Sequence, residues 1–231
     1  MSEYRPELEP LTDRIARLPV HRGYPVPWFV EWITTDANGE PEQQRIGVGE
    51  PDFRIMSRER FYIALRSSLC WVCGDRLGAH KAFTIGPMCA VNRTSAEPPS
   101  HRECAEWSAR NCPFLTRPHM RRREAGLPAG IDPNDPNVPG IMLKRNPGVT
   151  LVWITRKPRT KRDPNGGILF DIGDPEDVSW WCQGRRATRD EVQASIDSGL
   201  PALSELAALD GPSAMRELDR RVEAAEVLLP A

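Results

Sequence analysis

The sequence predicts an α+β fold, because strand and turn signals occupy its earlier part and helix signals its last quarter. Two segments, residues 28–33 and 150–155, are rich in Trp, Ile, Val and Thr, as β-strands are. From Thr188 onward, apolar residues recur at three- and four-residue steps, as they do on amphipathic helices. We therefore expect a small, mostly antiparallel sheet and a helical C-terminal part.

The composition is that of a folded protein with a substantial core. The chain has 231 residues, of which 39% are hydrophobic and 27% charged, and its 23 prolines indicate many short elements. It begins with a polar, acidic stretch, and no apolar run reaches the roughly 18 residues of a membrane span. We expect a cytoplasmic protein, in which the six cysteines are metal ligands or free thiols rather than disulfides.

Local signals place several elements in the first half of the chain. Residues 1–27 are expected to be a flexible lead-in, and Asp36–Gly39 has the composition of a hairpin turn after the first strand. Ser57 is suited to cap a helix over residues 58–67. An N-terminal domain is expected over residues 28–125, including a segment at 69–115 that carries most of the cysteines.

A Pro-, Gly- and Asn-rich loop at residues 126–147 is expected to separate this domain from a C-terminal part at 148–231. Strands at 150–155 and 168–172, with a turn at 163–167, are expected to form one long β-hairpin.

Helix signals follow this hairpin. Thr188 and Glu191 have the spacing of a capping box, and Gly199 is expected to end the first helix. Pro201 and Pro212 are suited to open two further helices. The last helix carries an apolar stripe made of Met215, Leu218, Val222, Ala225 and Leu229.

Four candidate metal ligands occur as two closely spaced pairs. Cys70 and Cys73 lie in a Cys-x-x-Cys-Gly sequence, where Gly74 permits a tight turn. His101 and Cys104 are three residues apart, in the first turn of a helix that Ser100 is expected to cap and that has Glu103 at its third position. Three thiolates and one imidazole are ligands that tetrahedral zinc prefers. The sequence therefore predicts one structural zinc ion.

The segment between the two pairs completes a known arrangement. Lys81–Ile85 followed by Gly86 and Pro87 fits a β-hairpin. A knuckle, a hairpin and a helix with two ligands in its first turn form the treble-clef zinc fold, which we expect to pack on the sheet. The alternative is that the cysteines are buried as small apolar side chains.

Three further cysteines leave the ligand set open. Cys89 could replace His101 if the predicted hairpin folds back, and Cys112 lies near Cys104 on the same helix face. We expect Cys112 and Cys182 to be packed in the core rather than to bind metal.

Several motifs resemble a group of uncharacterised phage, prophage and bacterial zinc-knuckle proteins. The segments that carry the resemblance are 71–74, 85–90, 96–101, 112–118, 180–181, 184–192 and 195–201. The sequence also resembles a looser set of actinobacterial proteins that have Cys at the position of His101, which supports His101 and Cys104 as ligands. The resemblance implies a role in a mobile element or in host takeover, and no particular activity.

Positive charge is concentrated in the middle of the chain. Residues 101–162 contain 13 Lys and Arg against 5 Asp and Glu, whereas residues 163–231 contain 6 against 14. Much of the positive charge lies in two clusters: Arg117, Arg121, Arg122 and Arg123, and Arg156, Lys157, Arg159, Lys161 and Arg162. If both clusters lie on one face of the protein, they form a surface that binds the phosphates of a nucleic acid. The alternatives are solvated turns or a contact with the acidic C-terminal part.

An enzymatic alternative is a divalent-metal nuclease of the His-Asn-His treble-clef type. His80, Asn92 and His101 resemble that family in their order, with His80 as the general base. Two departures weaken the resemblance: His80 lacks the neighbouring Asp or His of the family, and His101 cannot serve both a structural zinc and a catalytic metal. No phosphate loop, nucleophile elbow or His-Glu-x-x-His sequence is present. We expect a protein without catalytic activity that binds nucleic acid or a host protein.

Overall fold

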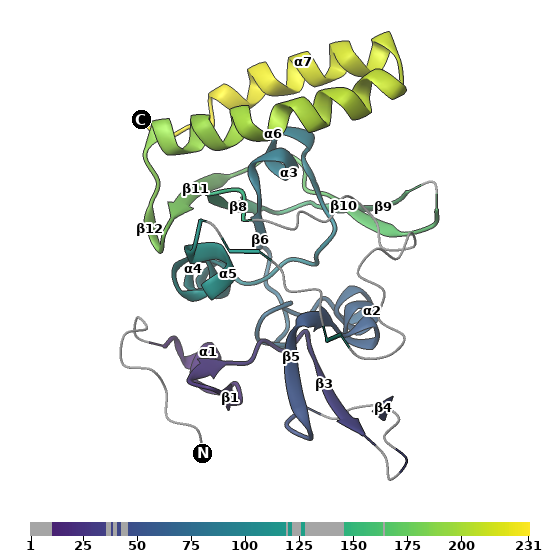
Figure 1. The fold of residues 1–231 in the computed structure, drawn as a ribbon, viewed down its shortest axis with the longest axis vertical. Helices are drawn as coiled ribbons and strands as arrows, with labels where there is room; N and C mark the ends of the chain where they lie inside the picture. Colours follow the sequence, from purple (N-terminus) through teal and green to yellow (C-terminus); the bar gives the residue numbers. More distant parts are fainter. Residues whose placement is uncertain are drawn as a thin grey trace.

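The computed structural model describes residues 11–35, 38, 41–42, 46–118, 120–121, 126–127, 146–163 and 165–231. These residues form an α+β fold with antiparallel sheets and two long C-terminal helices (Figure 1), as the sequence predicts. Among them we find no helix with the length and apolar character that crossing a membrane requires.

A four-stranded antiparallel sheet, in the order β12-β11-β8-β6, lies at the centre of the fold. Its strands are β6 (Lys81–Ile85), β8 (Thr150–Thr155), β11 (Asp177–Cys182) and β12 (Arg185–Arg186). All six residues of β8 are buried, because helices cover both faces of the sheet. Leu151 and Trp153 pack with α6 (Arg189–Leu209), whereas Val152 and Ile154 pack with α4 (Arg102–Asn111).

The pairing of β6 with β8 joins distant parts of the sequence in one sheet. Ala82 lies opposite Ile154, and Thr84 opposite Val152. The strand predicted at residues 150–155 is confirmed with its bounds. Its neighbour β6 precedes the loop at residues 126–147 that was proposed as a domain boundary. Most of that loop lies outside the described residues, and the division into domains stays a prediction.

The basic residues that follow β8 form a strand of their own. A three-stranded sheet in the order β7-β10-β9 contains β7 (Thr94–Ser95), β9 (Arg159–Arg162) and β10 (Ile168–Asp171). The predicted hairpin between residues 150–155 and 168–172 is therefore wrong, because β8 pairs with β6 and β11. The predicted turn is present, and it joins β9 to β10: the Asp163 backbone N–H donates to the Gly167 carbonyl at 2.9 Å.

The N-terminal part forms small elements beside the Cys70 knuckle. They are α1 (Asp13–Ala16), β1 (Val20–His21), β2 (Tyr24–Pro25), β3 (Val30–Thr35), β4 (Pro41–Glu42), β5 (Glu50–Met56) and α2 (Arg58–Ser67). Helix α2 has the predicted bounds, with Ser57 at its N-cap. Within the predicted lead-in, residues 11–27 contain α1 and the β1–β2 pair, and Ile15 is fully buried. The predicted turn at residues 36–39 lies outside the described residues except for Asn38.

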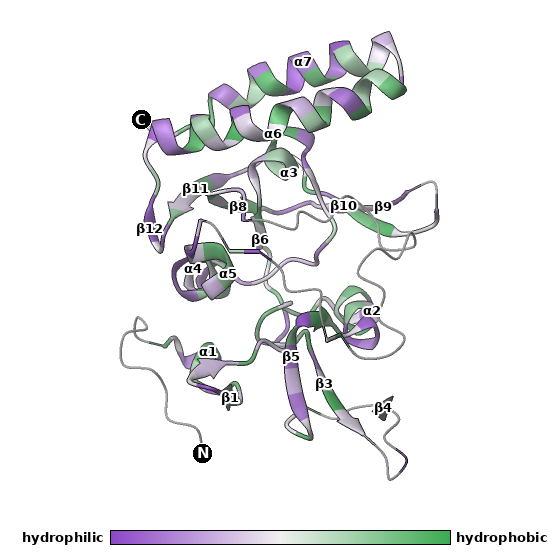
Figure 2. Cartoon of the chain, viewed as in Figure 1, coloured by the Kyte–Doolittle hydropathy of each residue, from purple (hydrophilic) through white to green (hydrophobic). Residues whose placement is uncertain are grey.

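The C-terminal helices α6 and α7 (Pro212–Glu226) pack side by side (Figure 2) and contact α3 (Pro87–Asn92). The capping box of Thr188 and Glu191 is confirmed. The helix end predicted at Gly199 is wrong, because α6 continues through Gly199 and Pro201 to Leu209. A Cβ atom on Gly199 would lie 2.8 Å from Cγ of Met88, so this glycine permits the close approach of α3.

On α7, Leu218 and Ala225 are buried members of the predicted apolar stripe and cluster with Val91 of α3. This contact holds the helix pair on the central sheet by way of α3.

Asn146 fixes the chain where it returns to the centre of the fold before β8. Its side chain is fully buried, and its Nδ2 donates to the carbonyls of Phe114, Leu115 and Arg117 at 2.5, 3.0 and 3.1 Å. Its Oδ1 accepts from the Gly148 backbone N–H at 2.7 Å. These bonds satisfy carbonyls at the end of α5 (Pro113–Thr116).

Replacing Asn146 with Ala should lower the free energy of unfolding by about 2–4 kcal/mol, because three carbonyls lose their donor at a buried site. Asn146→Asp is the matched variant: it keeps the acceptor and the volume but loses the donor, and should destabilise the protein as well. Chemical denaturation measures both. An Asn146→Asp variant as stable as the wild type would show that the hydrogen bonds from Nδ2 to the three carbonyls do not stabilise the fold.

Candidate metal centre

The first ligand pair lies on a tight turn that begins at Cys70. The Gly74 backbone N–H donates to the Cys70 carbonyl at 2.9 Å, and the Cys70 N–H donates to the Asp75 carbonyl at 2.7 Å. Gly74 has a φ of +77°, and a Cβ atom there would lie 2.7 Å from the Trp28 ring. Both its conformation and the space around it therefore require glycine. The tight turn at this position is the one that the sequence predicts.

The second ligand pair lies at the start of α4. His101, rather than the predicted Ser100, is the N-cap residue. Ser100 instead forms an isolated antiparallel bridge with Ala82 of β6, and their backbones exchange two hydrogen bonds, at 2.7 and 2.9 Å. The helix consequently begins one residue later, and Glu103 stands at its second position.

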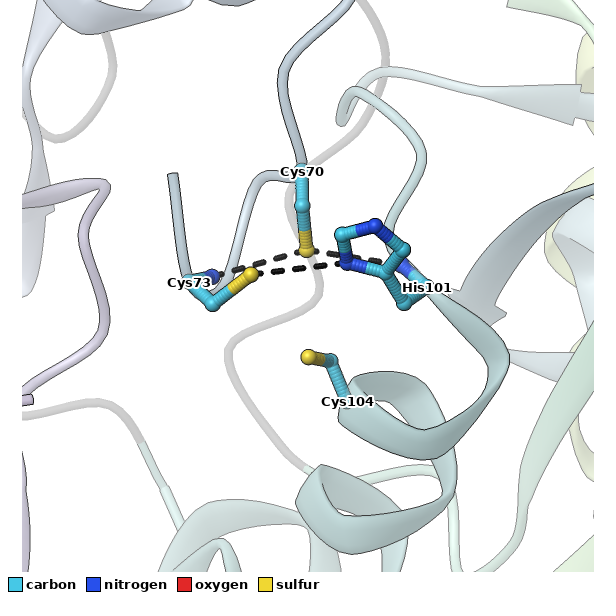
Figure 3. Close-up of side chains that lie close together, drawn as sticks. All are labelled: Cys70, Cys73, His101 and Cys104. Carbon is cyan, nitrogen blue, oxygen red and sulfur yellow. Dashed lines mark hydrogen bonds between the residues drawn. The ribbon is translucent and has the colours of Figure 1, made fainter. Parts of the chain in front are cut away.

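The four predicted ligands converge in space. Sγ of Cys70, Cys73 and Cys104 and a ring nitrogen of His101 all lie within 4.8 Å of one another. Figure 3 shows the three sulfur atoms and the imidazole turned toward a common centre. Ligand atoms of a tetrahedral zinc site with bonds of about 2.3 Å to sulfur lie about 3.8 Å apart. The Cys3His cluster, as we call these four residues, could therefore hold a metal ion such as zinc.

The hairpin expected between the ligand pairs is wrong. β6 pairs with β8 and, at Ala82, with Ser100, and the residues after β6 form α3, with Gly86 as N-cap and Pro87 at its first turn. The knuckle and the ligand-bearing helix agree with the sequence analysis, but the treble-clef arrangement is not confirmed.

The orientation of His101 suits a metal at Nδ1. Its Nε2 lies 3.1 Å from the Arg76 carbonyl oxygen, which can only accept, so Nε2 carries the proton. Nδ1 lies 3.4 Å from the Cys73 sulfur, inside the cluster. A backbone carbonyl that binds the outer ring nitrogen is a common way to fix the tautomer of a metal-binding histidine.

The surroundings of Cys70 favour a thiolate. Burial opposes its ionisation, but hydrogen bonds from Cys104, Cys73 and His101 place its pKa well below the ordinary value. Backbone N–H groups of Cys73 and His101 each lie 3.4 Å from its sulfur. The pKa of Cys104 is raised by its contacts with Cys70 and Cys73. Cys104 lowers the pKa of Cys73, while Cys70 and burial raise it, to a net value of about 11.

Ion pairs tie α1 to both ligand-bearing elements. Arg14 contacts Asp75 after the knuckle and Glu103 on α4, both at 2.6 Å, and Arg17 contacts Asp75 at 2.6 Å. These pairs are largely exposed, so each contributes on the order of 0–1 kcal/mol. Beneath them, Ile15 packs with Cys70 and Cys104. This contribution of α1 was not predicted, and its one signal in the sequence is the apolar Ile15 between the charged residues Arg14 and Arg17.

The remaining cysteines of the chain lie elsewhere. Among the described residues, the only metal-binding group of three or more His, Cys, Asp and Glu side chains is the Cys3His cluster. Cys89 lies in α3 against the central core, where burial raises its pKa to about 11. Cys112 ends α4, and Cys182 is buried in β11.

The two residues of the nuclease alternative have different surroundings. His80 is exposed, and its Nε2 lies 3.1 Å from Oε2 of Glu176. The other carboxylate oxygen of Glu176 binds Arg156 at 2.7 Å. Asn92 ends α3, and its backbone carbonyl accepts from Thr94 and Arg221. His101 belongs to the Cys3His cluster. The described part of the chain therefore brings no second metal cluster around His80.

The predicted basic residues are exposed where they are described. Arg117 and Arg121 are exposed beyond α5, whereas Arg122 and Arg123 lie outside the described residues. Arg156, Lys157, Arg159, Lys161 and Arg162 are all exposed, the last three on β9. Figure 1 shows α5, which ends one residue before Arg117, and β9 at separate places in the fold.

Comparison of the chain with protein-family models, curated proteins and solved structures gives no match. The assignment of the metal centre therefore depends on its geometry alone.

Protein purified without added metal should contain one zinc ion per chain, and Cys70→Ser or Cys104→Ser should lose it and unfold at lower temperature. Elemental analysis and thermal melting measure these effects. Cys112→Ser is the matched control, since Cys112 lies outside the cluster, and should keep its zinc. Zinc content and melting that are unchanged in both ligand variants would contradict the assignment.

The apparent affinity for zinc should rise with pH. Since the pKa values of Cys73 and Cys104 are raised in the metal-free cluster, both thiols hold protons at neutral pH that zinc must displace. The association constant should increase about tenfold per pH unit for each displaced proton. Competition with a chelator of known pH dependence, from pH 6 to 8, measures it. A constant affinity over this range would contradict the protonated state of the two thiols.

Proposed function

We propose that this chain is a zinc-stabilised binding protein without catalytic activity, whose partner is a nucleic acid. The Cys3His cluster supports the first part, because its four protein ligands fill a tetrahedral coordination sphere and leave no position for a substrate. Cys70 and Cys104 are fully buried. Such a site stabilises a fold rather than activating water.

The observation that carries nucleic-acid binding is the exposed basic strand β9. Five cations, which we call the β9 cluster, lie within seven positions: Arg156, Lys157, Arg159, Lys161 and Arg162. All four residues of β9 are exposed although they belong to a sheet, so both faces of this edge are accessible. Closely spaced cations of this kind bind successive phosphates with an affinity that falls as salt rises.

β9 lies at the edge of its sheet. β10 pairs with β9 on one side and with β7 on the other, and Figure 1 shows β9 and β10 at one side of the molecule. The outer edge of the basic strand is thus accessible to a partner. The cluster is not neutralised as a whole: Arg156 pairs with Glu176, whereas Lys161 and Arg162 bind the uncharged oxygens of Thr94 and Gly166.

Two parts of this function rest on sequence arguments. We propose at most an auxiliary role for the basic residues Arg117, Arg121, Arg122 and Arg123, of which the structure describes only the first two. Association with a phage or prophage rests on the resemblance of the motifs. A host protein as partner and a His80-dependent nuclease are the alternatives that the experiments below separate.

Binding of fluorescent single- and double-stranded DNA and RNA should be saturable and salt-dependent. Arg159→Gln/Arg162→Gln should weaken it and, with double-stranded DNA, reduce the slope of log K against log salt by about 1.8, at roughly 0.9 per phosphate contact. Arg216→Gln/Arg220→Gln on α7 removes the same charge elsewhere and should leave binding unchanged. Equal weakening in both variants would indicate a non-specific charge effect and contradict an interface at β9. No binding to any of the four probes would contradict a nucleic-acid partner.

Incubation of the same probes with Mg²⁺ or Mn²⁺ tests the absence of catalysis. We expect intact probes with the wild type and with His80→Ala. Cleavage by the wild type that is lost in His80→Ala would establish the nuclease alternative instead.

A further inference from the structure

A polar pocket of about 290 Å³ lies where the end of α3, strands β9 and β10 and helix α7 meet. Three cationic side chains from separate elements line it: Arg93 after α3, Lys161 on β9 and Arg221 on α7. Asp171 and Asp174 also line it, from β10 and the loop that follows. The volume is at the lower end of the range of ligand sites, which suits a small ligand.

The three cations have donors for which the described part of the chain supplies no acceptor. Arg93 donates through Nη1 to Asp174, and Lys161 donates to Oγ1 of Thr94 at 3.0 Å. Arg221 donates through Nε to Glu217 at 2.8 Å and through Nη1 to the carbonyl of Asn92. A guanidinium group has five N–H donors and an ammonium group three. Each side chain is therefore held in place while it still offers donors to a ligand.

The two carboxylates differ in how firmly they are held. Oδ1 of Asp171 accepts from the backbone N–H of Gly173 at 3.1 Å, which turns it toward its own loop. Asp174 is 85% exposed, and its contact in the described structure is Arg93. An exposed pair of this kind contributes on the order of 0–1 kcal/mol. An incoming anion can therefore displace Asp174 from Arg93 at little cost.

We propose that this pocket binds a phosphate group, with Arg93, Lys161 and Arg221 as donors and Asp174 as an internal competitor for Arg93. Arginine matches a phosphate with two parallel N–H bonds, and three cations from three elements surround one anion. The same cations oppose the binding of a metal ion at the two carboxylates. The phosphate can be free or the terminal group of a nucleic acid. The proposal does not depend on nucleic-acid binding by β9, because inorganic phosphate alone tests it.

Titration of the ¹⁵N-labelled full chain with inorganic phosphate, at ionic strength held constant with NaCl, tests the pocket by NMR. We expect the amide signals of Arg93 and Gly173 to shift and to saturate, with a dissociation constant on the order of millimolar for phosphate. Arg93→Gln and Lys161→Met should each weaken binding at least about tenfold. Asp174→Asn should tighten it by about two- to fivefold, since it removes the competitor. This gain cannot come from a folding defect.

Arg220→Gln is the matched control, since it removes a charge next to Arg221 without lining the pocket, and should bind phosphate as the wild type does. No saturable shift, or binding that Arg93→Gln and Lys161→Met leave unchanged, would overturn the proposal. A second titration compares 5′-phosphorylated with 5′-hydroxyl oligonucleotides. A preference for the phosphorylated form supports a nucleic-acid end as the source, and equal binding supports free phosphate.

Discussion

The structure depends first on the convergence of two ligand pairs, with Cys73 and His101 lying 28 positions apart in the sequence. The knuckle is joined to its surroundings by backbone bonds, from Trp28 to Val72 at 2.7 Å and from Trp71 to Pro99 at 3.1 Å. Structural zinc binds such sites with about 10–16 kcal/mol, as much as the whole net stability of a typical domain, about 5–15 kcal/mol. A zinc ion bound with that energy would make closure of the Cys3His cluster decisive for this part of the fold.

Helix α4 carries this constraint from the cluster to the central sheet. Cys104 faces the cluster, and Ala105 and Ala109, one turn apart, pack on Val152 and Ile154 of β8. Their small side chains permit the helix to lie close to the strand. β8 in turn leads directly into the β9 cluster. The Cys3His cluster is thus connected through α4 and β8 to the exposed basic strand.

Signals that act over a few residues were predictable from the sequence. The bounds of α2 and β8, the capping box at Thr188 and the spacing within each ligand pair follow from local chemistry, because each needs only neighbouring residues. The sequence also indicated the correct turn at Asp163, but not which strands it joins.

Apart from the meeting of the two ligand pairs, which their metal-binding residue types indicated, interactions between distant segments were not predictable. Gly199 resembles a helix end, but it lies inside α6, where the absence of a side chain makes room for Met88 of α3. The residues of β6 resemble half of a hairpin, because the sequence does not reveal that β8 is their partner. The pocket beside Arg93 escaped notice for the same reason: its three cations come from three elements that meet only in the fold.

Zinc-edge X-ray absorption on protein purified without added metal tests the metal centre most directly. We expect a first shell of three sulfur atoms at about 2.3 Å and one nitrogen atom at about 2.0–2.1 Å. A shell of oxygen and nitrogen alone, or a chain that is fully folded after its metal is removed, would contradict a structural Cys3His zinc site.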